Sequence, residues 1–407
     1  MEQTIVKKQS WWQLLSIQAG GIICLPVILV GQLVCQQYGW SAALLAVGCG
    51  NIFLLTTGYL LSSLSTYRQQ TTVQHAAHYF GSRGRMLFAS LMMLSMLGWF
   101  GIQLNVMSQS GAQLFHLFGI AISPLILNIS LGIALSGIMC LGMRALKWLS
   151  YFSGPILGVT LLYALFSAHG AMPAAESLTI SSLGGLSLVI GANIAAVIDL
   201  PTFFRHARSP KDGRICITLL YGLIVPLIEI AGIYLSAITG GSNILEVLQA
   251  GHGIGWMAWI SCFVLLSGWA TNNANLYSAI ASSHSLPGRL TPFKRTLLLG
   301  FAGVAIACLN PLGNIEGILD LLGITIGSMG AVILASYLLE RWRQKQFYGI
   351  SLLSWSVGVA LGICSSHFKW LITGVPTLDA FFAAGLVQLT FNKIYQRKKT
   401  YETIDYR

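Results

Sequence analysis

The stretch Gln18-Ala19-Gly20-Gly21-Ile22-Ile23-Cys24-Leu25-Pro26 interrupts the first long apolar run of the chain. Glycine costs about 1 kcal/mol against alanine in a helix interior, and proline removes a backbone hydrogen bond. In a membrane, unwound backbone is tolerated only where protein buries it or where it lines a cavity. The stretch therefore predicts a broken helix, and the rest of the chain decides whether that helix crosses a membrane.

A second apolar run carries glycines in a corresponding place. It reads Gly184-Gly185 and then Gly191-Ala192-Asn193, with Pro201 near its end. Two interrupted helices in matching positions of two halves are the best sequence pointer to the binding site of a secondary transporter built from inverted repeats. Glycines also serve helix packing, so the pattern needs support from other features. We expect both runs to be broken near their glycines.

The composition is that of a membrane protein. Of the 407 residues, 55% are hydrophobic and 9% charged, and the mean hydropathy is +0.72, whereas a soluble domain carries about 25% charged residues. The runs are continuously apolar rather than alternating, which favours helices over a β-barrel. We predict twelve spans, with limits near 11–34, 41–63, 86–112, 121–143, 148–168, 182–204, 214–239, 255–282, 296–310, 314–338, 348–365 and 374–392.

The basic residues follow the predicted spans. Of the 23 Lys and Arg, all except Lys369 fall on one side of a twelve-span arrangement. The positive-inside rule makes that side cytoplasmic and places both termini there. Helical spans and short loops are typical of a carrier in a bacterial inner membrane. These anchors explain the net charge of +11, so nucleic acid is not an expected partner.

Polar residues inside the spans are few and share helix faces. Trp99 and Gln103 are four residues apart in the third span, and Ser267, Thr271 and Asn275 follow at the same spacing in the eighth. Asn272 and Asn273 widen this second stripe. Interhelical hydrogen bonding would explain any single one of them. A whole stripe of hydroxyl and amide oxygens favours an alkali cation or a polar ring as the ligand, and not zinc or copper.

Three acids lie within the spans, and a buried unpaired carboxylate is costly. Asp199 could pair with Arg205 or Arg208, and we expect that structural role for it. Glu229, inside a continuous apolar run, is the proton-coupling candidate. Asp320 is expected near the outer mouth or against a partner helix.

Other function classes lack their signatures. The chain has no GxxxxGK[ST], no HExxH and no GxSxG motif, and its loops are too short to hold a nucleotide-binding domain. A channel would need a continuous polar stripe through a pore, and a membrane enzyme would need paired catalytic carboxylates; the sequence shows neither. We therefore predict no enzyme activity and no cofactor.

Three segments together resemble the nucleobase:cation symporter-1 family, and among its members the cytosine permeases. The stretch 201–213, Pro-Thr-Phe-Phe-Arg-His-Ala-Arg-Ser-Pro-Lys-Asp-Gly, is similar to the family signature P-D-F-S-R-Y-A-R-S-P-[RK]-D. Gly98-Trp99-Phe100-Gly101 matches the family's third-span motif. The stretch 269–278, Trp-Ala-Thr-Asn-Asn-Ala-Asn-Leu-Tyr-Ser, is similar to its eighth-span motif W-[TS]-T-N-x-N-x-L-Y-[SA].

The resemblance implies a LeuT-like all-α fold in one membrane domain, residues 1–407. Residues 11–168 and 182–338 would form two inverted five-helix repeats, followed by two additional helices in 348–392. It also implies import of a nucleobase-like ring together with sodium or a proton. Trp99 would stack on the ring; Gln103, Asn193 and Asn275 would read its edge, with backbone groups around Gly191. A sodium-type site would use carbonyls of Gly20 and Cys24 together with Ser267, Ala270 and Thr271.

The sequence departs from the family pattern at three of these positions. Thr202 replaces the signature aspartate, while Asp199 lies one turn earlier. Asn193 stands where a second stacking aromatic is common, and Ala270 stands where a hydroxyl often helps to hold sodium. The last change favours proton coupling through Glu229. We predict a monomeric secondary transporter for cytosine or a related base, with a thiamine-precursor pyrimidine, allantoin or a hydantoin as the alternative substrate.

Overall fold

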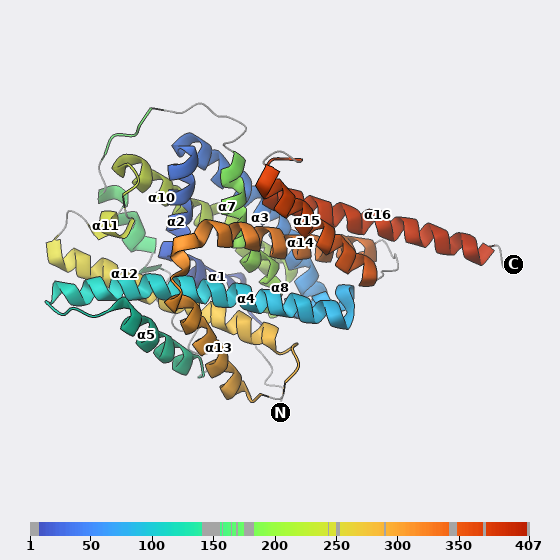
Figure 1. Ribbon diagram of the computed structural model, residues 1–407, viewed down its shortest axis with the longest axis horizontal. Coiled ribbons are helices and arrows are strands. Elements are labelled where there is room, and N and C mark those ends of the chain that lie inside the picture. Colours follow the sequence, from blue (N-terminus) through green and yellow to red (C-terminus); the bar gives the residue numbers. More distant parts are fainter. Residues whose placement is uncertain are drawn as a thin grey trace.

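A computed structural model describes residues 8–140, 155–156, 158–163, 165–167, 170–174, 183–242, 244–249, 253–288, 290–341, 348–368 and 372–404. In these residues the regular elements are all helical, and one isolated bridge joins Gln9 to Ala207. The all-α membrane fold predicted from the sequence is confirmed. Figure 1 shows α4 and α12 running side by side along the length of the molecule, with the C-terminal α16 projecting at one end.

The observed helices coincide with the predicted spans in order, but α4 begins 14 residues before the third span and α16 ends 12 residues after the last one. The first half contains α1 (Trp11–Ile22), α2 (Leu25–Tyr38), α3 (Trp40–Arg68), α4 (Thr72–Leu117) and α5 (Pro124–Met139). The second half contains α7 (Gly184–Ile198), α8 (Leu200–Phe204), α9 (Pro210–Leu219), the π-helical η2 (Leu220–Ile224), α10 (Val225–Thr239), α11 (Ile244–Gln249), α12 (Gly253–Ser283), α13 (Pro292–Cys308), the 3-10 helix η3 (Pro311–Asn314) and α14 (Ile315–Arg341). Two further helices follow, α15 (Tyr348–Phe368) and α16 (Pro376–Ile404). In the fifth predicted span, 148–168, residues 148–154, 157, 164 and 168 lie outside the described residues.

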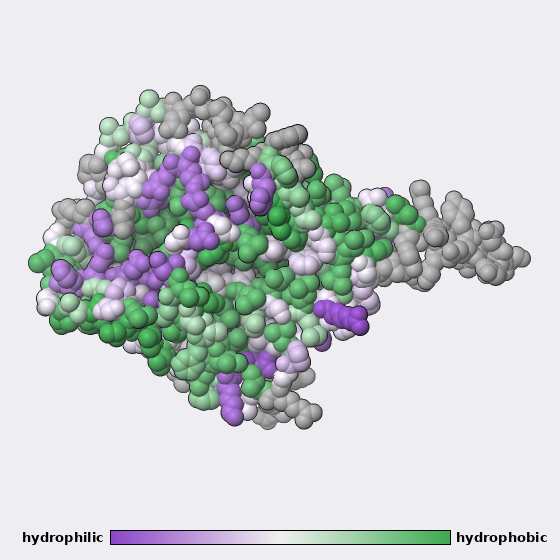
Figure 2. All heavy atoms as spheres, in the orientation of Figure 1, coloured by the Kyte–Doolittle hydropathy of each residue, from purple (hydrophilic) through white to green (hydrophobic). Residues whose placement is uncertain are grey.

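Length and composition identify the elements that could cross a membrane. Among the described residues, 7 helices are long and apolar enough, or 8 if the bent α1–α2 pair counts as one span. Large apolar side chains remain exposed on α5 and α13, among them Ile126 at 60% and Phe293 at 60%. Figure 2 shows hydrophobic residues spread over these helices. Such a continuous apolar surface suits contact with lipid.

The break predicted in the first span is present. Helices α1 and α2 meet at an angle of 60°, and Cys24 between them has the extended backbone angles φ −148° and ψ 161°. Pro26 lies in the first turn of α2, where its missing N–H costs no helical hydrogen bond. The glycine–proline stretch therefore breaks the first span, as its composition predicts.

The break predicted at the glycines of the sixth span is wrong in position. Helix α7 continues through Gly191 and Asn193, and the interruption comes later, at Asp199, before the short α8 with Pro201 in its first turn. A Cβ at Gly191 would lie 2.3 Å from the carbonyl oxygen of Leu319. This glycine thus permits close packing of α7 on α14 and does not unwind its helix.

Candidate functional site

The centre of the candidate site lies where α4 crosses α12. Trp99 of α4 is partly buried against a cluster that includes Val189 of α7 and Leu319 of α14. One turn further along α4, Gln103 is fully buried, and neither its Oε1 nor its Nε2 has a hydrogen-bond partner in the described structure. A Cβ at Gly268 would lie 2.6 Å from Gln103 Nε2, which places this amide against the α12 backbone. An unpaired buried amide is costly, so Gln103 calls for a polar ligand or water.

Helix α12 adds further unpaired amides beside this point. Asn272 Oδ1, both amide atoms of Asn273, and Asn275 Nδ2 lack partners in the described structure. Asn272 Nδ2 contacts only the sulfur of Met107, at 3.9 Å. Asn272 and Asn273 were expected only to widen the polar stripe, yet they are fully buried and almost fully buried, respectively. Gln103 and Asn272 therefore present unpaired amide atoms at the α4–α12 interface, where a polar ligand or water could satisfy them.

Two of the residues predicted to bind substrate face other helices. Gly191 packs on α14 as described above. Asn193 Nδ2 donates to Val189 O at 3.2 Å and to Glu229 Oε1 at 3.0 Å. The structure therefore brings Trp99 and Gln103 together on α4, but it commits the Asn193 amide nitrogen to a carboxylate on α10. Asn275 lies on α12 at the edge of a separate small cavity.

Glu229 forms part of a buried polar junction between three helices. Its carboxylate is fully buried and accepts from Asn51 Nδ2 of α3 at 2.6 Å and from Asn193 of α7. A Cβ at Gly31 of α2 would lie 1.9 Å from the Glu229 carbonyl oxygen, so α2 packs directly on the α10 backbone here. Glu229 lines none of the cavities described below.

The residues of the expected sodium-type site are buried near the α1–α2 break. Gly20, Cys24, Ser267, Ala270 and Thr271 are all buried. The Cys24 side chain lies close to the Thr271 hydroxyl, and this contact joins the break to α12. Thr271 Oγ1 donates to Ser267 O at 2.9 Å, and Ser267 Oγ donates to Val264 O at 3.1 Å. Their hydroxyl oxygens keep lone pairs that a small cation could use.

Asp199 is not ion-paired as the sequence led us to expect. Arg205 Nε donates to His206 Nε2 at 3.0 Å and its Nη2 to Tyr277 Oη at 3.5 Å, while the one ion pair of the described residues joins Arg68 to Glu340. Asp199 instead accepts from the hydroxyls of Thr202 at 2.6 Å and Ser278 at 2.5 Å. The expected pairing fails because α8 turns the arginine away from the carboxylate.

Asp199 also borders a small cavity of about 50 Å³ between α1, α4, α7, α8 and α12. Its polar lining consists of Gln18, Asp199, Asn275 and Ser278. Asp320, the third acid, lies on α14 close to Ser187 of α7, whose hydroxyl is hydrogen-bonded to Thr377. It is therefore an acid against a partner helix, one of the two positions expected for it.

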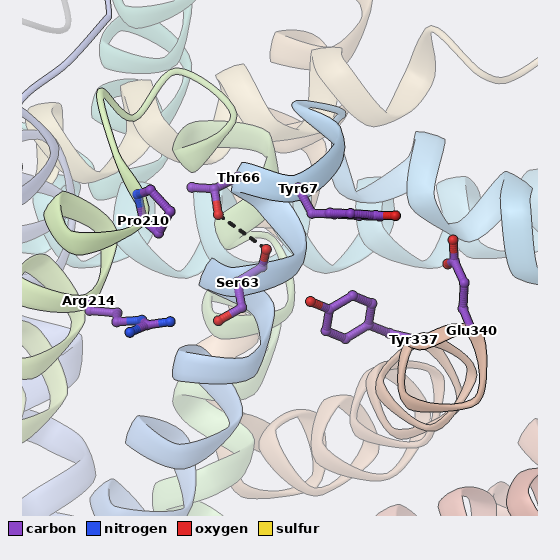
Figure 3. Close-up of a pocket in the computed structure, with 7 residues that line it drawn as sticks. All are labelled: Ser63, Thr66, Tyr67, Pro210, Arg214, Tyr337 and Glu340. Carbon is purple, nitrogen blue, oxygen red and sulfur yellow. Dashed lines mark hydrogen bonds between the residues drawn. The ribbon is translucent and has the colours of Figure 1, made fainter. Parts of the chain in front are cut away.

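Two larger cavities contain none of the predicted site residues. One of about 360 Å³ is lined by α2, the end of α4 and α11, and includes Gln32, Gln36, Gln109 and Gln113. The other, of about 510 Å³, lies between the ends of α3 and α14 and the start of α9. Figure 3 shows Arg214 on one side of it and Tyr337 and Glu340 on the other, with Ser63 and Thr66 between them.

Comparisons with known proteins identify the family and the fold of the chain. A family profile described as "Permease for cytosine/purines, uracil, thiamine, allantoin" matches residues 5–352. The cytosine permease of Escherichia coli strain K12 is 26% identical over 408 residues, which cover 93% of each chain. Among solved structures, Mhp1, a nucleobase-cation-symport-1 family transporter in a closed conformation with bromovinylhydantoin bound, superposes with a TM-score of 0.77 at 18% identity, covering 98% of this chain and 96% of the other. A Na⁺-coupled sialic acid symporter superposes with a TM-score of 0.68 at 12% identity, covering 95% and 90%. These likenesses show a LeuT-like fold.

Proposed function

The chain belongs to the family of permeases for cytosine/purines, uracil, thiamine and allantoin, and on that premise we propose that it imports a nucleobase-like heterocycle by cation symport with alternating access. It is a multi-pass membrane transporter and not an enzyme. Cytosine is the first candidate substrate, because curated relatives of nearly full length are cytosine permeases.

The observation that carries the proposal is the fully buried Gln103 amide without a partner, one turn from Trp99. A planar ring stacked on Trp99 would gain dispersion and π contacts. Its polar edge would satisfy the Gln103 amide together with Asn272 or Asn273 of α12. A site of this kind discriminates strongly, because an analogue without the matching groups leaves buried polar atoms unpaired.

The coupling ion would be sodium or a proton. The Cys24–Thr271 contact joins the α1–α2 break to α12, which favours a shared cation site. The alanine at 270 removes one hydroxyl from that site, and Glu229 is a carboxylate available for proton coupling. Substrate and cation would stabilise each other's binding, and this coupling must be reciprocal. We further propose function as a monomer in the inner membrane, with both termini cytoplasmic.

The test is uptake of radiolabelled cytosine into proteoliposomes, with sodium and proton gradients imposed separately. We expect Trp99→Ala and Gln103→Ala to reduce uptake by about 5- to 150-fold, because each removes a contact worth about 1–3 kcal/mol. Trp259→Ala is the matched control, since this tryptophan is 46% exposed and lies near the start of α12, away from Asn272. Equal uptake by wild type and Trp99→Ala would contradict the proposed site.

The alternative substrates are a thiamine-precursor pyrimidine, allantoin or a hydantoin. The bromovinylhydantoin bound to Mhp1 supports the last of these. A thermal-shift panel with cytosine, uracil, allantoin and hydantoin would separate them, because a ligand stabilises the folded state according to its affinity.

A further inference from the structure

Asp199 is a buried carboxylate that forms no ion pair among the described residues. It is 1% exposed, and its two oxygens accept from the hydroxyls of Thr202 and Ser278. Thr202 is in turn in contact with Thr72 of α4, at 3.2 Å between the hydroxyls. An ionised carboxylate in this position lacks the counter-charge that membrane interiors normally supply, so it must take up either a proton or a cation.

No basic side chain among the described residues forms an ion pair with Asp199. Arg205 is the cation that acts on Asp199 electrostatically, but its described hydrogen bonds go to His206 and Tyr277. Helix α1 offers no charged side chain to this region. The other titratable groups on the elements packed around α7 and α8 at this end include Tyr67 and Arg68 on α3, His75, His78 and Tyr79 on α4, Tyr277 on α12, and Tyr337 and Glu340 on α14. Of these, Arg68 and Glu340 neutralise each other.

A small polar cavity lies beside Asp199. Gln18 of α1 is 8% exposed, and its Nε2 has no partner; Asn275 Nδ2 of α12 has none either. Both side chains line the cavity of about 50 Å³ together with Asp199 and Ser278. That volume holds a few water molecules at about 10–15 Å³ each. Water there would accept from the two amides and donate toward the carboxylate.

The hydrogen-bond partners distinguish Asp199 from Glu229. A hydroxyl that donates to a carboxylate can rotate and accept once the carboxylate is protonated. An amide NH₂ cannot accept, so protonation of Glu229 would oppose a donor to Asn51 or Asn193 unless an amide flips and gives up its bond to Val47 or Val189. The Asp199 site can therefore exchange a proton by rotation of a hydroxyl, whereas the Glu229 junction needs the flip of an amide that also bonds to a helix carbonyl.

We propose that Asp199 is the proton-binding residue that couples transport, an inference that rests on the proposed symport function. The proton would come from the outer solution through water in the Gln18–Asn275 cavity and bind one carboxylate oxygen, where the Ser278 hydroxyl turns from donor to acceptor. When the inner side opens, the same proton leaves to cytoplasmic water and the carboxylate is again ionised. Each cycle thus carries one positive charge inward with the neutral substrate.

The test compares two modes of transport in proteoliposomes that contain wild type, Asp199→Asn or the control Asp320→Asn. Asparagine imitates the protonated, neutral state, so Asp199→Asn should retain cytosine counterflow within about twofold and lose pH-driven accumulation by at least about tenfold. Counterflow also reports that the variant is folded. Asp320→Asn changes an intramembrane acid that lies outside the cavity and should behave as wild type.

Ser278→Ala provides a second measurement in a milder variant. It removes a 2.5 Å hydrogen bond from the ionised carboxylate, which makes the protonated form easier to reach. The pH profile of uptake should therefore move to higher pH, by about one unit.

Three results would overturn the assignment. The first is pH-driven accumulation by Asp199→Asn at the wild-type level, and the second is loss of pH-driven accumulation in Glu229→Gln but not in Asp199→Asn. The third is accumulation by wild type under a sodium gradient alone. Failure of the proposed function would look different. In that case wild type would show neither uptake nor counterflow of cytosine or of any heterocycle in the panel.

Discussion

At the residue scale, the buried carboxylate of Glu229 is fixed by hydrogen bonds from the amides of Asn51 and Asn193. The three residues come from α3, α10 and α7 and are all at most 4% exposed. A hydrogen bond to a charged group contributes about 1.5–3 kcal/mol, and its loss leaves a buried acceptor unsatisfied. The junction therefore stabilises the contact between helices that lie far apart in the sequence.

Asn51→Ala should consequently lower the free energy of unfolding by about 2 kcal/mol. The change would be measured by heating the protein in detergent and quantifying the remaining folded fraction by size-exclusion chromatography. Thr56→Ala on the same helix is the control, because the Thr56 hydroxyl bonds only to the carbonyl of Ile52 in its own helix. Equal losses of stability in the two variants would show that the amide contributes nothing specific.

The sequence predicted correctly which residues lie together when they belong to the same helix. Trp99 and Gln103 share a face of α4 because helical periodicity requires it. The sequence could not show that Asn193 points to Glu229 or that Arg205 turns away from Asp199. Those outcomes depend on how α7 is rotated against α10 and on the direction of α8, which are properties of the packed bundle.

At the element scale, the same distinction explains why one glycine break was located correctly and the other was not. In the first span, glycines and a proline fall within seven residues and the helix breaks among them. In the sixth span, Gly191 is a contact point for the Leu319 carbonyl, and Asp199 begins the break instead. A glycine has the same appearance in a sequence whether it loosens a helix or lets a neighbour approach, so only the packed partner decides.

Close packing of α2 on α10 gives a prediction at this scale. A Cβ at Gly31 would lie 1.9 Å from Glu229 O, and one at Gly232 would lie 2.0 Å from Ile28 O. Because both contacts are with backbone, Gly31→Ala should force the helices apart and cost about 1–3 kcal/mol. Gly48→Ala on α3 has no atom within 4 Å and is the control. A melting temperature of Gly31→Ala equal to that of Gly48→Ala would disprove the close contact.

At the scale of the whole molecule, backbone hydrogen bonds tie the N-terminal segment to the second half of the chain. Gln9 N donates to His206 O at 2.7 Å, Arg208 N donates to Gln9 O at 2.7 Å, and Trp11 N donates to Asp212 Oδ1 at 2.9 Å. These bonds tie the start of α1 to the segment between α8 and α9. The cavity of about 360 Å³ lined by four glutamines lies at the other end of α2 and α4. The positive-inside rule predicts that the tethered end is cytoplasmic, and we propose that the cavity lined by glutamines opens to the outer side.

If the α1 tether holds the inner side closed, weakening it should move the population toward the inward-facing state. Asp212→Ala removes the bond to Trp11, a loss of about 1 kcal/mol or up to about fivefold in the equilibrium. A cysteine introduced by Gln113→Cys in the outer cavity reports that population through its rate of labelling by a membrane-impermeant maleimide. We expect Asp212→Ala to slow the labelling, whereas Lys211→Ala, an exposed neighbour outside the tether, should leave it unchanged. Faster labelling in Asp212→Ala would mean that the tether holds the transporter open to the inside, and equal rates would mean that it does not take part in alternating access.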